Sequence, residues 1–92
     1  MLILNPQFFF IMNIFVASLN FRTQEDSLHA LFEEFGEVDS LKIIMDRETG
    51  RSKGFGFVEM SNDDDALKAI DALNESDFEG RTIVVKKATP RN

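Results

Sequence analysis

The chain of 92 residues contains no cysteine, tryptophan or tyrosine. Without cysteine it has neither a disulfide nor a thiolate metal ligand, and a reducing cytoplasm suits it, so we expect a cytoplasmic location. The single histidine, His29, has no second histidine at metal-ligand spacing. We therefore expect no metal site, no cofactor and no catalytic set of side chains. The ten phenylalanines carry every aromatic role.

The chain also lacks a hydrophobic run long enough to cross a bilayer. A spanning helix needs about 20 apolar residues, and the apolar stretch that begins at Phe8 is interrupted at Asn13. A signal peptide starts with basic residues, whereas the first basic residue of this chain is Arg22. We therefore expect no membrane segment.

Three segments are predicted: a leader over residues 1–11, one domain over residues 12–89 and a tail over residues 90–92. One small domain is what a chain of this length can form. Met12 stands where the domain begins, so we expect the leader to lie outside it and Met12 to be the natural start. The structural alternative is that residues 8–11 pack on a sheet edge or on another chain.

The net charge of −6 taken alone argues against a nucleic-acid partner. The charges are unevenly spread, however. Residues 41–58 contain four basic and two acidic residues, and residues 80–92 contain four basic and no acidic residues. If the acidic blocks are helices, the two signs lie on different faces of the molecule.

Two amphipathic helices are predicted. The first is indicated by apolar residues that recur at helical spacing over residues 28–35. Thr23 is expected to be its N-cap, because threonine is a preferred residue at that position. Gly36 is expected to end this helix in a left-handed conformation. A second helix is expected after Asn62, because the acids of residues 63–65 favour the N-terminal end of a helix dipole.

Four strand-like stretches accompany the helices: residues 13–18, 38–45, 54–60 and 82–87. A polar hairpin loop over residues 46–52 joins the second to the third. The order is strand, helix, strand, strand, helix, strand. It predicts an α+β, ferredoxin-like βαββαβ sandwich, in which a four-stranded antiparallel sheet carries both helices on one face.

The stretch KGFGFVEM over residues 53–60 indicates which way the phenylalanines point. Side chains alternate along a strand. One face therefore carries Lys53, Phe55, Phe57 and Glu59. A face bounded by two charges is costly to bury, and the glycines on the other face suit close packing of the helices. We expect Phe55 and Phe57 on the open face, joined by Phe15 if the first and third strands are neighbours. Aromatic side chains rimmed by cations hold single-stranded nucleic acid by base stacking.

These residues resemble the RNA recognition motif family over residues 12–89. Residues 53–60 match its octamer, K/R-G-F/Y-G/A-F-V-x-F/Y, at seven of eight positions, with Met60 where an aromatic is usual. Residues 14–19 resemble the shorter hexamer of the family, with Phe15 as its aromatic residue. The chain is also similar to small single-domain bacterial members.

The resemblance implies a module that binds single-stranded RNA. Stacking of two or three bases predicts a moderate, salt-sensitive affinity, and we expect a monomer, with association through the leader as the alternative. The resemblance also implies that Phe15 and Phe55 each stack a base, that Phe57 contacts sugars and that Lys53 contacts a phosphate. Further candidates for RNA contacts are Asn13, Lys42, Arg51, Arg81, Lys86 and Arg91.

Two alternatives stay open at this point. Single-stranded DNA is one, because stacking does not distinguish the sugars and discrimination rests on contacts to the 2′-hydroxyl. A protein-binding or self-associating module that uses the same aromatic patch is the other. The intact set of three phenylalanines favours nucleic acid, because a protein-binding descendant would have no need to keep it.

Overall fold

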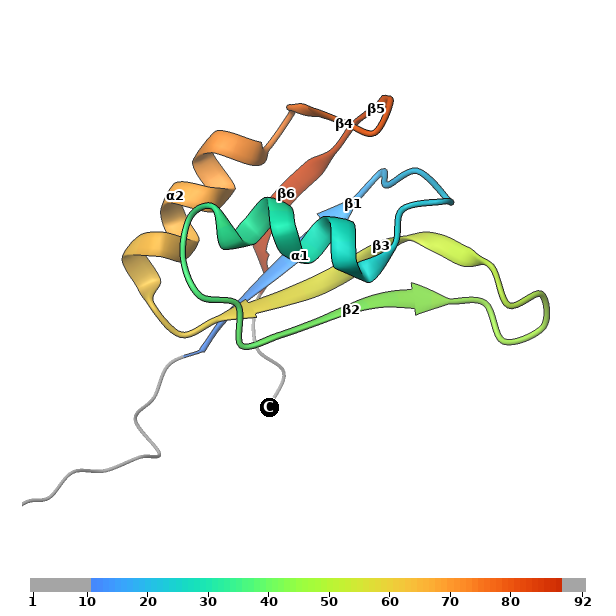
Figure 1. Ribbon diagram of the computed structural model, residues 1–92, viewed down its shortest axis with the longest axis horizontal. Helices are drawn as coiled ribbons and strands as arrows, with labels where there is room; N and C mark the ends of the chain where they lie inside the picture. Colours follow the sequence, from blue (N-terminus) through green and yellow to red (C-terminus); the bar gives the residue numbers. More distant parts are fainter. Residues whose placement is uncertain (1–10, 89–92) are drawn as a thin grey trace, which may run out of the picture.

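The computed structural model describes residues 11–88 (Figure 1). The elements, in chain order, are β1 (Met12–Ala17), α1 (Glu25–Glu33), β2 (Ser40–Met45), β3 (Ser52–Met60), α2 (Asp63–Leu73), β4 (Asp77–Phe78), β5 (Arg81–Thr82) and β6 (Val84–Ala88). The expectations for residues 1–10 and 89–92, including Arg91, lie outside the described residues.

The main sheet has four antiparallel strands in the order β2-β3-β1-β6. Both helices cover one of its faces, and the other face is open (Figure 1). The predicted ferredoxin-like βαββαβ sandwich is therefore confirmed. The two-residue strands β4 and β5 pair with each other before β6 and form a second small sheet that the sequence did not predict.

The core lies between the sheet and the helices. Because side chains alternate along each strand, every second residue of a strand points into this core. Along β3 every second residue from Ser52 to Met60 is buried, and the residues between them face the open side. From α1, Leu28 and Phe32 are fully buried against this layer, and α2 contributes Ala66 and Ala69. Burial of Met60 agrees with its expected place in the core.

The start of α1 differs from the prediction. The N-cap is Gln24, which makes no side-chain capping bond. Thr23 lies one residue before this cap, and its hydroxyl donates to Glu79 Oε1 at 2.7 Å. The α2 prediction is confirmed, because Asn62 Oδ1 accepts a hydrogen bond from Asp65 N at 3.0 Å.

Gly36 does not have the predicted left-handed conformation, and α1 already ends at Glu33. Its small size serves a different purpose. A Cβ at this position would overlap the side chain of Asp65, in the first turn of α2. Gly36 therefore lets the chain after α1 pass close to α2.

The neighbours of the β3 glycines also differ from the prediction, because the atoms closest to these glycines do not belong to the helices. A Cβ at Gly56 would overlap the Lys42 carbonyl and lie 3.0 Å from Ile43 Cα in β2. Gly56 thus permits a close approach of two strands, beside the register shift in β2 between Ile43 and Met45.

The hairpin between β2 and β3 is the polar loop that the sequence predicts. Asp46 Oδ1 accepts hydrogen bonds from the backbone N–H of Glu48 at 2.8 Å and of Thr49 at 3.2 Å. These bonds stabilise the carboxylate and lower the pKa of Asp46 below its ordinary value. The loop is therefore held by its own side chain.

The helices of the described region are short. None of those within residues 11–88 is long and apolar enough to span a bilayer. Over the same residues, no group of three or more acidic or histidine side chains is placed to hold a metal ion.

Candidate nucleic-acid interface

Three phenylalanine rings meet on the open face of the sheet, and we call Phe15, Phe55 and Phe57 the aromatic platform. The ring centroids of Phe15 lie 5.8 Å from Phe55 and 5.6 Å from Phe57. Those of Phe55 and Phe57 lie 6.3 Å apart, edge to face. These spacings are typical of interacting aromatic pairs. The three rings therefore form one continuous surface.

Strand register brings these rings together. In the β1–β3 pair, Phe15 lies opposite Phe57 and Ala17 lies opposite Phe55. Residues that face each other across a strand pair point to the same side of the sheet. Phe57 keeps 36% of its surface exposed, although Val58 beside it is fully buried. The alternation of the sequence therefore places the aromatic side chains on the open face.

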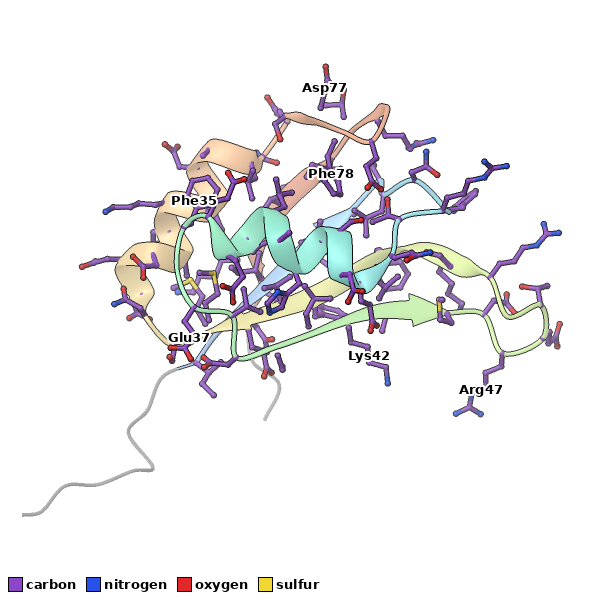
Figure 2. The ribbon with its side chains drawn as sticks, viewed as in Figure 1. Phe35, Glu37, Lys42, Arg47, Asp77 and Phe78 are labelled. Atoms are coloured by element: carbon purple, nitrogen blue, oxygen red, sulfur yellow. The ribbon has the colours of Figure 1, made fainter. Side chains whose placement is uncertain are left out.

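Lysine side chains border the aromatic platform on both sides. Lys42 lies opposite Phe57 in the β2–β3 register, and Lys86 lies opposite Phe15 in the β1–β6 register. Lys53 lies on the same face of β3 as Phe55 and Phe57, and all three lysines are exposed. Figure 2 shows Lys42 pointing away from the helices.

These lysines carry no ion pair. Within residues 11–88 the one basic side-chain nitrogen within 4.0 Å of a carboxylate oxygen is that of His29, which lies beside Glu33 on α1. The ammonium groups beside the aromatic platform are therefore available to an anionic ligand.

A shallow hollow of about 440 Å³ lies next to Phe57, and we call it the sheet hollow. Asn13, Lys42 and Glu59 are among the residues that line it, together with Ala88. Ser40 Oγ donates a hydrogen bond of 2.7 Å to Glu59 Oε1 at this place. The hollow therefore combines one ring with an amide, an ammonium, a hydroxyl and a carboxylate.

Ser40 is a lining residue that the sequence interpretation missed. Ser40 could have been found, because it lies two residues before Lys42 in the same strand and so shares its face. Ala88 also lines the hollow, because β6 continues past Lys87 and Ala88 pairs with Asn13.

Two predicted contact residues lie off the open face. Arg51 precedes β3 and lines a different groove, with Phe21 and Met45. Arg81 belongs to β5, where its Nε donates to the Ser18 carbonyl at 3.1 Å. Both are exposed, at the end of the molecule where β1 ends.

The comparisons with known proteins agree with this geometry. A family model described as RNA recognition motif matches residues 14–84. The chain is similar to RbpB of Nostoc sp., which is named as an RNA-binding protein. The two are 46% identical over 80 residues, which make up 87% of this chain and 78% of RbpB.

Solved structures show the same likeness. The crystal structure of RNA binding protein PG1 is 49% identical, with a TM-score of 0.84 over 88% of this chain and 98% of that one. The RRM of Rna15 with bound RNA (GU) is 26% identical, with a TM-score of 0.77 over 85% and 83% of the two chains. The family match, the relatives and the sheet topology agree, and the chain belongs to the RNA recognition motif family.

Proposed function

We propose that the chain, as a monomer, binds single-stranded RNA on the open face of its sheet. The observation that carries this proposal is the aromatic platform itself. Its three ring centroids lie within 6.3 Å of one another, and within residues 11–88 no acidic side chain forms an ion pair with the lysines beside them. A base has a flat apolar face that stacks on such rings, and its phosphate is attracted to the neighbouring ammonium groups. Membership of the family supports the same conclusion.

Each ring has a distinct place in the proposed complex. Phe15 on β1 and Phe55 on β3 each stack one base, and Phe57 contacts the sugars between them. Lys53, two residues before Phe55 on the same face, contacts a phosphate. Lys42 and Lys86 flank the platform and add to the attraction for the strand.

The sheet hollow offers a means of selecting a base. The Asn13 amide presents both donors and an acceptor, whereas the Glu59 carboxylate presents acceptors alone. The Ser40 hydroxyl already donates to Glu59, which leaves the hydroxyl oxygen as an acceptor. A base edge that reaches the hollow beside Phe57 meets this set of groups.

A double variant, Phe55→Ala with Phe57→Ala, tests the proposal. Each stacked base contributes about 1–3 kcal/mol, so we expect the affinity for a mixed-sequence single-stranded RNA to fall by at least about tenfold. Fluorescence anisotropy measures the affinity at low and at moderate salt, with a DNA oligonucleotide of the same sequence titrated in parallel.

Leu67→Ala is the matched control, because Leu67 is an exposed apolar residue on α2. It should bind as the parent does. A correctly folded double variant with parental affinity would refute the proposal. Absence of RNA binding by the parent, together with concentration-dependent dimers in sedimentation, would favour the protein-binding alternative.

A further inference from the structure

Within residues 11–88, Glu59 is the one acidic residue on the open face of the main sheet. Besides the aromatic platform, this face carries Asn13 and Ala17 of β1, Ser40, Lys42 and Ile44 of β2, Lys53 and Glu59 of β3, and Val84, Lys86 and Ala88 of β6. A carboxylate repels the phosphates that the lysines of this face attract. Its place in the middle of a surface for nucleic acid therefore calls for an explanation.

Two neighbouring strands place polar side chains directly across from Glu59. Ser40 lies opposite it in the β2–β3 register, and Asn13 lies opposite it in the β1–β3 register. Ser40 Oγ donates a hydrogen bond of 2.7 Å to Glu59 Oε1. The carboxylate is thus held in position before any ligand arrives, which lowers the ordering cost of binding.

The second oxygen of this carboxylate is not occupied by the protein. Within residues 11–88, Glu59 Oε2 accepts no hydrogen bond, and Lys42 on the neighbouring strand makes no ion pair with it. Both residues line the sheet hollow beside Phe57. The carboxylate therefore retains the capacity to accept hydrogen bonds from a group that enters the hollow.

The sheet hollow combines this acceptor with a strong donor. A carboxylate only accepts hydrogen bonds, whereas the Lys42 ammonium only donates them. The hollow of about 440 Å³ is shallow and open to the face on which bases are expected to stack. It therefore suits a base whose edge has donors on one side and an acceptor on the other.

Guanine is the base with that edge. Its Watson–Crick edge presents two adjacent donors, N1–H and the N2 amino group, followed by the O6 acceptor. Uracil has a single N–H between two carbonyls, and adenine and cytosine each have one amino group beside a ring-nitrogen acceptor. Guanine alone can donate two adjacent hydrogen bonds to a carboxylate, and bonds to an ionised group are the stronger kind.

We propose that the sheet hollow is a guanine-selective subsite. The Glu59 carboxylate accepts from N1–H and from the N2 amino group of one guanine, and the Lys42 ammonium donates to its O6. Ser40 is a positioning residue, because it acts through Glu59. This inference rests on the proposed function, because the aromatic platform must hold the strand that carries the guanine.

A base series tests the inference on the parent protein. Heptauridine is compared by fluorescence anisotropy with heptamers whose central base is guanine, hypoxanthine, adenine or cytosine. The guanine heptamer should bind at least about fivefold more tightly than the uracil, adenine and cytosine heptamers, the lower end of what a bidentate base contact contributes. The hypoxanthine heptamer should lie between guanine and uracil, because hypoxanthine keeps N1–H and O6 but lacks the amino group.

Glu59→Gln tests the role of the carboxylate. The amide oxygen can still accept from Ser40, but an amide nitrogen, which donates, replaces the second acceptor. The variant should bind the guanine and uracil heptamers within about twofold of each other, because the bidentate contact is lost. It should bind heptauridine at least as tightly as the parent does, because a negative charge near the phosphates has been removed.

Two further variants separate base selection from charge and from folding. Asp71→Asn removes one negative charge from an exposed position on α2 and should keep the parental preference for guanine. Ser40→Ala keeps the carboxylate but not the bond that positions it, so its preference for guanine should be smaller than that of the parent. Unfolding midpoints show that each variant is folded.

Three results would overturn the inference. One is an equal affinity of the parent for all five heptamers, and another is a preference for a base other than guanine. The third is a change in Glu59→Gln that is the same for every heptamer, which would assign Glu59 a general electrostatic or structural role. Failure of this inference alone leaves all heptamers bound in a manner that depends on Phe55 and Phe57, whereas failure of the proposed function leaves none of them bound.

Discussion

Phe55 and Phe57 sit on a strand whose other face is buried, and alternation alone sends their side chains outward. The same residues on the inner face would have added to the core. Their outward position leaves apolar surface in water, and neighbouring rings with lysines beside them are a surface on which bases stack. The arrangement is thus better explained by binding than by stability.

Lys53→Gln tests the phosphate contact at the scale of one residue. Each phosphate neutralised on a single strand contributes about −0.7 to the slope of log K against log salt concentration. We expect the variant to bind RNA more weakly at low salt and its slope to be shallower by about 0.7. Titrations at four salt concentrations measure this slope.

Lys68→Gln is the matched control, because Lys68 is an exposed lysine on α2. It should leave the slope unchanged. The phosphate contact of Lys53 would be refuted by equal slopes for Lys53→Gln and the parent.

The face of the sheet on which the β3 side chains lie could largely be predicted from the sequence. The charges at residues 53 and 59 placed Phe55 and Phe57 on the open face, as observed. The position of Phe21 was not predictable, because it depends on a positive φ at Gly54 and on a loop that Asn20 holds to the distant Glu79. Such geometry leaves no periodic signal in a sequence.

At the scale of elements, one backbone N–H on each edge strand of the main sheet donates a hydrogen bond to a side chain. Glu25 Oε2 accepts from Ile43 N on β2, and Asn74 Oδ1 accepts from Val85 N at 2.9 Å on β6. An unpaired edge is a template for pairing with another chain. Both bonds join a helix or its end to an edge strand, so they also fix the helices over the sheet.

The helix ends show where sequence reasoning succeeds and fails. The second helix follows Asn62 as predicted, and Asn62 caps it through Asp65 N, three residues further along the chain. Thr23 does not cap α1, because the helix starts one residue later than predicted, with Gln24 at the N-cap. The hydroxyl of Thr23 donates to Glu79, a partner 56 residues away that local rules do not predict.

Asn62→Ala should lower the free energy of unfolding by about 1 kcal/mol, the usual effect of losing an N-cap acceptor. Gln24→Ala is the matched change at the N-cap of α1, where no side-chain bond exists to lose. It should have little effect. Urea denaturation measures both, and equal destabilisation by the two changes would contradict this account of the caps.

At the scale of the molecule, the net charge of −6 conceals a separation of signs. Acids begin both helices, at Glu25 and Asp26 in α1 and over residues 63–65 in α2. Lys42, Lys53 and Lys86 lie on the open face. We therefore expect RNA to be attracted to the open face of the sheet and repelled from the helix-covered side.

The topology of the main sheet and its two helices could be predicted, because each long element has a clear period and the order of these elements specifies the sandwich. The β4–β5 hairpin could not, because two-residue strands show no alternation. The groove lined by Phe21, Arg51 and Met45 could not be predicted either, since it forms only when the β1–α1 loop and the β2–β3 hairpin meet in space.

Nuclear magnetic resonance tests most directly the central claim that RNA binds to the open face of the sheet. We expect a short single-stranded RNA to shift the ring resonances of Phe15, Phe55 and Phe57 upfield through stacking, and to perturb the amides of β1 and β3 more than those of α1 and α2. Perturbations confined to the helices, or ring resonances unmoved at saturating RNA, would contradict the account.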